Sequence, residues 1–228
     1  MQISTEHGLA FLCMAKCAST AIESAITDYC NIKFSGRTSI KHINAQVFND
    51  HILAAHKKLV RSSHIESVCM IRDPLDWIES WYRYRSRNQL MSPKSPQHAK
   101  YTGNVSYNEF LLEYMSKGKR KPFAQLRTQY NFLSLASGRI GLDRIIPFDN
   151  FKLLNQFFSE KFGHEIEITL KNTSPRIPIS LDSDVEEKLR QYLAKDIAVY
   201  DFVKEHGQYI KALHSDKLYA VLQDTSED

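Results

Sequence analysis

The sequence contains no run of about 20 consecutive apolar residues, which is the length that a membrane-spanning helix requires. Residues 8–15 are apolar, but the run is too short for a membrane span. Because neither a basic segment nor a cleavage site flanks it, we expect no signal peptide. No internal repeat and no low-complexity linker divides the 228 residues. We therefore expect a single domain over residues 1–228.

Cysteine is scarce and is not arranged as a metal site. Cys13, Cys17, Cys30 and Cys69 all lie in the first third of the chain, without a C-x-x-C pair and without a paired histidine motif. We expect no metal site and four reduced thiols. Reduced thiols are typical of a cytoplasmic protein.

Composition excludes the extreme classes of protein. Hydrophobic residues make up 43% of the chain and charged residues 25%, as in an ordinary folded protein. The formal net charge is +4, which is too small to indicate a nucleic-acid partner but suits an anionic ligand.

Glycine is also rare, with 8 residues, and none of them lies in the segment that looks most like a phosphate-binding loop. The glycine-rich nucleotide motif G-x-x-x-x-G-K-[ST] is absent. Instead, an apolar run predicts a strand over 9–14, and helical spacing predicts a helix over 20–30. Thr20 and Glu23 have the spacing of a capping box, which predicts that this helix begins at Thr20.

The loop over residues 14–22 has what an anion site needs. A helix N-terminus offers unpaired N–H groups and a partial positive charge, and Lys16 adds a full charge. The alternative interpretation is an ordinary strand–helix turn with a surface lysine.

Two further apolar runs, 68–71 and 144–148, predict buried strands. Helical patterns are predicted before and after them, over 74–86, 106–116, 124–136 and 149–162, and in one long stretch from Asp182 to Tyr200. Ser106 and Glu109 have the spacing of a second capping box, and Asp149 is expected to cap the helix that ends at Phe162. Residues 1–8 are interpreted as a polar leader. The alternation predicts an α/β fold with a central, mainly parallel sheet flanked by helices. Ligands of such folds bind beyond the carboxyl ends of the strands.

Arg72 follows the strand over 68–71, and Asp73-Pro74 predicts a helix start directly after it. Ser80 lies eight residues after Arg72, two turns into that helix, so the guanidinium and the hydroxyl could reach one phosphate. The alternative for Ser80 is a small residue on a helix face. Together with Lys16, this motif predicts two phosphate sites, as in a nucleoside with phosphates at both ends.

These two motifs, residues 15–21 and 72–82, resemble those of the sulfotransferases that use 3′-phosphoadenosine 5′-phosphosulfate, most closely the small carbohydrate-type branch. Weaker similarities lie at 41–45, 147–151, 170–176 and 192–200. The sequence departs from the family pattern at five positions: Ala15 replaces a proline, Ala21 a hydroxyl residue, Trp77 an arginine, Asp149 a glutamate and Lys171 a histidine.

The resemblance implies a single P-loop-like domain that transfers a sulfuryl group from this co-substrate to an acceptor hydroxyl, on a carbohydrate or glycan-containing molecule. Lys16 would stabilise the leaving oxygen. The residues implied in binding the co-substrate are Lys16, Cys17, Ala18, Ser19, Thr20, Ala21, Arg72, Ser80, Asn172, Ser174 and Arg176. An irregular loop is the alternative interpretation for the last three.

Three residues are candidates for the general base that takes the proton of the acceptor hydroxyl. His42 is the first candidate, because the resemblance places its segment near the acceptor. His56 is the second, and Glu23 is the third, although a capping role explains Glu23 better. For each histidine, a surface or hydrogen-bonded position is the competing interpretation.

The basic runs 83–87 and 117–121 are interpreted as solvated faces, or as contacts for an anionic glycan acceptor. The long segment 87–104 is a candidate acceptor-side loop. Two other functions stay open: a nucleotide-dependent phosphotransferase on a P-loop-like fold, and a non-catalytic module that binds a polyanion.

Overall fold

A computed structural model describes residues 1–60, 64–169 and 179–225, and it confirms the α/β class. The described strands form one open six-stranded sheet in the order β3-β1-β2-β4-β5-β6. The strands are β1 (Gln2–Ser4), β2 (Leu9–Phe11), β3 (Ile32–Lys33), β4 (Glu66–Ile71), β5 (Arg144–Pro147) and β6 (Tyr209–Ile210).

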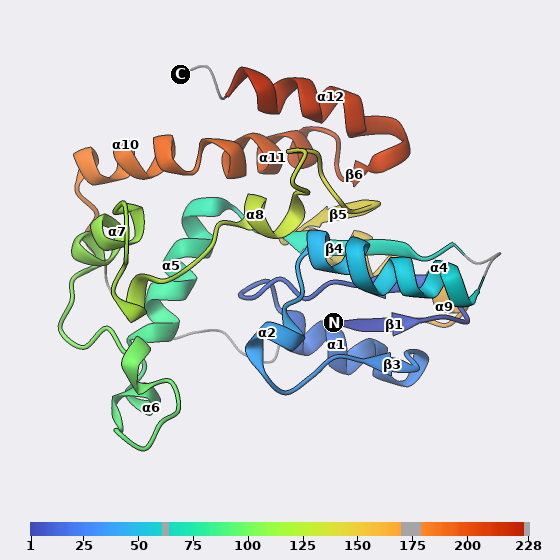
Figure 1. Cartoon of the computed structure of the whole chain (residues 1–228), viewed down its shortest axis with the longest axis horizontal. Coiled ribbons are helices and arrows are strands. Elements are labelled where there is room, and N and C mark those ends of the chain that lie inside the picture. Colours follow the sequence, from blue (N-terminus) through green and yellow to red (C-terminus); the bar gives the residue numbers. More distant parts are fainter. Residues whose placement is uncertain (61–63, 170–178, 226–228) are drawn as a thin grey trace.

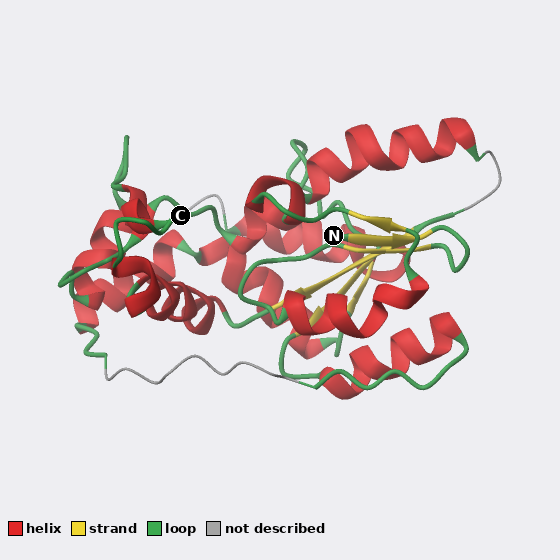
Figure 2. Cartoon of the chain, turned by 90° about the horizontal axis from the view of Figure 1, so that it is seen from below, coloured by secondary structure: helices red, strands yellow, loops and turns green. Residues whose placement is uncertain are grey.

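Helices lie on both faces of the sheet (Figures 1 and 2). The α-helices are α1 (Ser19–Ile26), α2 (Thr38–Lys41), α3 (Ala45–Val47), α4 (Ala54–Leu59), α5 (Pro74–Arg85), α6 (Asn88–Met91), α7 (Tyr107–Met115), α8 (Gln129–Leu133), α9 (Phe151–Phe162), α10 (Ser183–Tyr192), α11 (Ala194–Glu205) and α12 (Lys211–Asp224). Short 3-10 turns lie at Thr27–Tyr29, His98–Lys100 and Pro122–Ala124, and Phe48–Leu53 is a π-helical stretch before α4. None of the described helices combines the length and the apolar character that crossing a membrane requires.

The sheet is mixed, so the prediction of a mainly parallel sheet is not confirmed. The central strands β2, β4 and β5 run parallel, whereas β1, β3 and β6 pair antiparallel with their neighbours. The interpretation of residues 1–8 as a polar leader is wrong, because residues 2–4 form β1 and are buried. Two polar side chains of β1 form hydrogen bonds. The Gln2 amide donates to the hydroxyl of Thr27, and the Ser4 hydroxyl is hydrogen-bonded to Nδ1 of His7.

The parallel centre of the sheet positions the site. Phe11 of β2 lies opposite Val68 of β4, and Ile71 of β4 lies opposite Pro147 of β5. The apolar run 68–71 is at most 1% exposed, as expected for a parallel strand covered on both faces. The segments that follow Phe11 and Ile71 therefore leave the sheet at the same edge. Helices α5, α6, α7 and α10 lie beyond this edge (Figure 1).

Two of the predicted helix starts are confirmed. The Asp73 carboxylate accepts hydrogen bonds from two N–H groups in the first turn of α5, with Pro74 as the first helical residue. Ser106 and Glu109 form the predicted capping box of α7. Asp149, however, does not cap α9. The side chain of Asn150 does so, and Asp149 forms an ion pair with Lys204.

Four predicted elements are longer than the observed ones. The helix over 20–30 ends at Ile26, before a 3-10 turn. The strand over 9–14 ends at Phe11, and only Gln129–Leu133 of the helix over 124–136 is α-helical. The long helix from Asp182 is two helices, which meet at Leu193. All four cysteines are buried, and none forms a disulfide.

The basic run 83–87 is not a uniform solvated face. Arg85 is 3% exposed, and its guanidinium donates hydrogen bonds to the carbonyl oxygens of Pro122, Phe123 and Gln125. It also lies 5.1 Å from the ring of Trp81. Burial lowers the pKa of Arg85 to about 10, so the group remains charged at neutral pH. Arg85 therefore joins α5 to the turn over 122–125 and is not available to an acceptor.

We predict that Arg85→Lys lowers the free energy of unfolding by about 2–4 kcal/mol, because an ammonium cannot reach all the carbonyls that the planar guanidinium bonds. The matched control is Arg190→Lys, on the exposed face of α10, where the arginine forms an ion pair with Glu186. This control should change stability by less than about 0.5 kcal/mol. Urea denaturation measures both, and equal effects would contradict the structural role of Arg85.

Candidate anion-binding site

The two predicted phosphate motifs are in direct contact. Lys16 follows β2 and Arg72 follows β4, and these strands are neighbours in the sheet. The Arg72 guanidinium donates a hydrogen bond through Nη1 to the carbonyl oxygen of Lys16, at 3.4 Å. The structure therefore brings Lys16 and Arg72 to one place beyond the carboxyl edge of the sheet.

The backbone of the Lys16 loop has an uncommon conformation. Lys16 and Ala18 have φ values of 67° and 51°, and they are the described residues other than glycine with positive φ. Such a conformation costs roughly 1–2 kcal/mol at each residue that has a Cβ atom. Within the described part of the chain, the main-chain N–H groups of residues 16–20 donate no hydrogen bond. A left-handed residue beside right-handed ones gathers N–H groups into a concave surface that attracts anions.

The capping box predicted at the start of α1 is wrong. The helix begins at Ser19, because Ala18 in the left-handed conformation turns the chain one residue earlier, and no side chain caps it. Glu23 instead forms ion pairs with Lys41, at 2.9 Å, and with the amino group of Met1, at 3.0 Å. Burial would raise the pKa of Glu23, but hydrogen bonding with Lys41 and the Met1 charge hold it below its usual range. Glu23 is thus occupied and is a poor candidate base.

The charges at the contact are not compensated. Burial, with the nearby charges of Arg87 and Arg72, lowers the pKa of Lys16 to about 8. Among the described residues, no carboxylate lies within ion-pair distance of Lys16 or Arg72. The Arg72 Nε atom is buried and has no hydrogen-bond partner in the described chain. Aromatic rings lie beside both cations instead: Tyr84 is 4.6 Å from the Lys16 ammonium, and Phe148 is 4.9 Å from the Arg72 guanidinium.

Two residues that the sequence analysis did not single out for the site hold the loops in place. Gln129 is fully buried, and its amide accepts from the Arg72 N–H at 3.0 Å and donates to the Arg72 carbonyl at 2.8 Å. The Cys17 thiol also points to the Gln129 oxygen, at 3.9 Å. The indole of Trp77 donates to the Ala15 carbonyl, at 2.9 Å. Gln129 lies 57 residues from Arg72, so no local spacing could have identified it.

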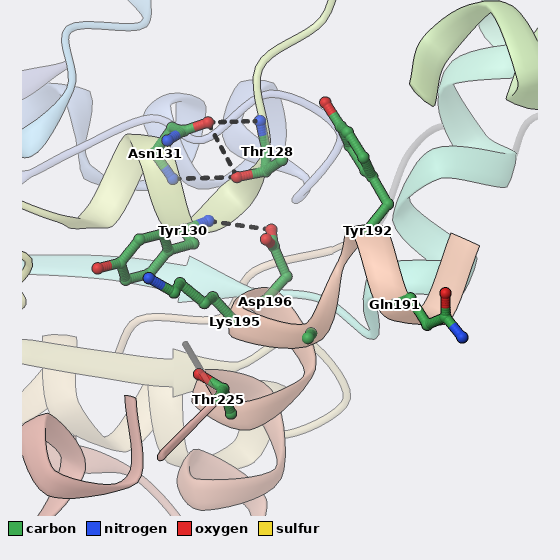
Figure 3. Close-up of a pocket in the computed structure, with 9 residues that line it drawn as sticks. Thr128, Tyr130, Asn131, Gln191, Tyr192, Lys195, Asp196 and Thr225 are labelled. Atoms are coloured by element: carbon green, nitrogen blue, oxygen red, sulfur yellow. Dashed lines mark hydrogen bonds between the residues drawn. The ribbon is translucent and has the colours of Figure 1, made fainter. Parts of the chain in front are cut away.

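The helix that carries Gln129 is itself fixed by a buried carboxylate. Asp196 of α11 is 2% exposed and accepts a hydrogen bond from the N–H of Tyr130, at 3.0 Å. Burial raises the pKa of Asp196 to about 6. Figure 3 shows this carboxylate pointing to Tyr130, beside the Thr128–Asn131 capping box. Asp196 thus positions α8, and α8 positions Arg72 through Gln129.

A hollow of about 390 Å³ lies beside Asp196 (Figure 3). It is lined by Thr128, Tyr130, Asn131, Gln191, Tyr192, Ala194, Lys195, Asp196 and Thr225. None of the predicted binding residues lines this hollow. The Asp196 carboxylate in its lining already accepts a hydrogen bond from the first turn of α8. We therefore place the candidate site at Lys16 and Arg72 and not in this hollow.

His42 lies at the junction between β2 and the Lys16 loop. Its Nδ1 atom is 2.6 Å from the carbonyl oxygen of Cys13, so Nδ1 donates and the lone pair lies on Nε2. Burial lowers the pKa of His42, which keeps the ring neutral at physiological pH. His56 lies on α4, from which the chain enters β4 at its amino end. The Lys16 loop and Arg72 lie at the opposite edge, so His42 is the better placed candidate.

The other predicted binding residues differ in their surroundings. Cys17, Ser19 and Ser80 are buried, with exposures of 1%, 7% and 7%, whereas Thr20 is exposed. The Thr20 hydroxyl accepts a hydrogen bond from Lys41, at 3.3 Å, and Ala21 is half-buried. Asn172, Ser174 and Arg176 lie outside the described residues.

Comparisons of the chain with protein-family models, with curated proteins and with solved structures find no match. A function can therefore be inferred only from the chain's own motifs and from the geometry and charge at Lys16 and Arg72.

We predict that Ala18→Gly raises the free energy of unfolding by roughly 0.5–1 kcal/mol, because glycine adopts positive φ without steric cost. The matched control is Ala25→Gly, inside the same helix, which should lower stability by about 1 kcal/mol. Urea denaturation of both variants checks the prediction. A loss of stability at both positions would show that the left-handed conformation at Ala18 is not strained.

Proposed function

We propose that the chain is a sulfotransferase that moves a sulfuryl group from 3′-phosphoadenosine 5′-phosphosulfate to an acceptor hydroxyl on a carbohydrate or glycan-containing molecule. The observation that carries this proposal is the contact of Arg72 with the Lys16 loop, where no carboxylate of the described residues pairs with either cation. Free N–H groups of residues 16–20 face no partner in the described chain, so an anion would satisfy charge and hydrogen bonding together.

The arrangement supports two anionic groups on one ligand. Lys16 and the N–H groups after it would hold the 5′-phosphosulfate, in a P-loop-like strand–loop–helix unit without glycine. Arg72 and Ser80 would hold the 3′-phosphate. The resemblance assigns Asn172, Ser174 and Arg176, which lie outside the described residues, to the same ligand. The sugar and base would then lie between the carboxyl ends of β2 and β4, as ligands of α/β sheets do.

The reaction that this arrangement supports is an in-line displacement at sulfur. The acceptor oxygen forms a bond to sulfur, and the bond from sulfur to the bridging oxygen breaks. The 3′,5′-bisphosphate leaves with both electrons of that bond. Negative charge grows on the bridging oxygen, where Lys16 and the loop N–H groups would stabilise it. The products are the sulfate ester and the bisphosphate.

His42 would take the proton of the acceptor hydroxyl on Nε2. Its Nδ1–H is held by the Cys13 carbonyl, so the neutral ring presents a lone pair and not a second N–H. The lowered pKa of His42 supports this role at neutral pH, because the ring is unprotonated before the reaction begins.

The acidic residues at the strand ends favour this function over a magnesium-dependent phosphotransferase. Asp73 after β4 caps α5, and Asp149 after β5 pairs with Lys204, so both carboxylates have other roles. A non-catalytic polyanion-binding module would use the same cations but would not need His42.

We predict that the protein binds 3′,5′-adenosine bisphosphate without magnesium. Lys16→Ala and Arg72→Ala should each weaken this binding roughly 10- to 100-fold or more, because each removes a charge-assisted hydrogen-bond donor. The control is Lys188→Ala, which removes an exposed lysine of α10 and should leave the affinity unchanged. Isothermal titration calorimetry measures all four proteins. Tight binding of magnesium ATP with no binding of the bisphosphate would contradict the proposal.

We further predict that His42→Ala keeps the affinity for the bisphosphate and lowers turnover by roughly 10²- to 10⁴-fold, as expected for loss of a general base. His51→Ala removes an exposed histidine and serves as the control. The wild-type rate should fall as the pH drops below the pKa of His42, which lies below 6.5, because protonated Nε2 cannot accept a proton. Sulfate transfer across glycan, lipid and phenol acceptors measures the rate. An unchanged rate in His42→Ala would remove the residue from the mechanism.

A further inference from the structure

Tyr84 lies on the last turn of α5, and its ring packs edge-on against Trp81 of the same helix, with the ring centroids 5.9 Å apart. Its ring centroid is 4.6 Å from the Lys16 ammonium and 5.1 Å from the Arg87 guanidinium. Its hydroxyl lies 3.3 Å from the Gln97 side-chain oxygen and donates to it. None of the motifs that predicted the phosphate site includes Tyr84 among its binding residues.

The electrostatics at Lys16 explain why an aromatic ring is needed there. The charged groups that act on Lys16 are Arg72 and Arg87, and both repel it. Cys17 is too weakly acidic to offset them at neutral pH, because burial raises its pKa to about 12. The negative face of an aromatic ring is the remaining favourable partner for the ammonium in the described surroundings of Lys16.

The hydroxyl of Tyr84 connects the same residue to the 87–104 segment. This segment is also attached to α5 near its end, where the Thr102 N–H donates to the Arg85 carbonyl at 3.1 Å. Directly after the segment, the Val105 carbonyl accepts a hydrogen bond from the Tyr82 hydroxyl at 2.9 Å. The bond from Tyr84 to Gln97 thus fixes the middle of the segment relative to the lysine.

We propose that Tyr84 is a positioning residue that holds the Lys16 ammonium at the anion site and fixes the 87–104 segment beside it through Gln97. The identity of the anion rests on the proposed sulfotransferase function, whereas the hold on Lys16 does not. The Tyr84 ring orients the Lys16 ammonium, which would contact the leaving group. The Tyr84 hydroxyl fixes the position of the 87–104 segment, which is the candidate acceptor-side loop.

Lysine acylation on the ligand-free protein tests the ring. The rate at Lys16 is followed against pH by mass spectrometry, with exposed Lys188 as the internal reference. Tyr84→Leu should make Lys16 roughly two- to fivefold more reactive at neutral pH, because its ammonium loses the ring and its pKa falls. Tyr84→Phe keeps the ring and should leave the profile unchanged. An unchanged profile in Tyr84→Leu would overturn the proposal.

Hydrogen exchange tests the hydroxyl. Tyr84→Phe and Gln97→Ala should both speed amide exchange over 92–104 while leaving β4 protected, and unchanged exchange would overturn this part of the proposal. Both variants keep the ring, so they remain informative if Tyr84→Leu does not fold.

Bisphosphate titration separates the two proposals. Tyr84→Leu should bind the bisphosphate roughly two- to fivefold more weakly than wild type. If wild type does not bind the bisphosphate, the sulfotransferase proposal fails, and the acylation and exchange results still decide the role of Tyr84. If wild type binds and Tyr84→Leu binds equally well, Tyr84 does not position Lys16.

Discussion

The parallel pairing of β2 with β4 is the constraint on which the candidate site depends. Phe11 lies opposite Val68 in this pairing, so the segments after the two strands leave the sheet side by side. Lys16 and Arg72 lie 56 residues apart in the sequence, yet a guanidinium of one reaches the backbone of the other. Gln129 then clamps both backbone groups of Arg72 from a third segment. The site is therefore a property of the sheet and not of either loop.

The backbone conformation and the paired positive charges of the site are unfavourable in free energy, and the rest of the fold offsets this cost. Lys16 and Ala18 adopt positive φ although both have side chains, and no carboxylate of the described residues pairs with Lys16 or Arg72. Each feature is unfavourable in isolation. The continuous core behind the loops, with the run 68–71 almost fully buried, supplies the rigidity that keeps them in place. Local violations of this kind are expected where a ligand completes the structure.

Basic residues of similar sequence context have quite different roles in this chain. Arg85 is buried and bonds backbone carbonyls, while Arg87, two residues later, lies beside Tyr84. Arg144 and Lys161 share the carboxylate of Glu66 at the amino end of β4. The sequence of the run 83–87 does not distinguish its arginines, because the residue type alone does not determine whether a side chain is buried. Which face of α5 packs on the 122–125 turn decides which arginine is structural.

The sequence by itself determined the features that depend on neighbours a few residues apart. These are the buried strands near 68–71 and 144–147, the caps at Asp73 and Ser106, and the position of the glycine-free loop at Lys16. The tertiary structure decided everything that depends on distant partners. Residues 2–4 form a strand, and Glu23 forms an ion pair with Lys41 instead of a capping box. Gln129 contacts Arg72, and Tyr84 contacts Lys16. The physical reason is that hydrogen bonds and ion pairs act over a few ångströms in space, and only the folded sheet fixes which distant side chains come within that range.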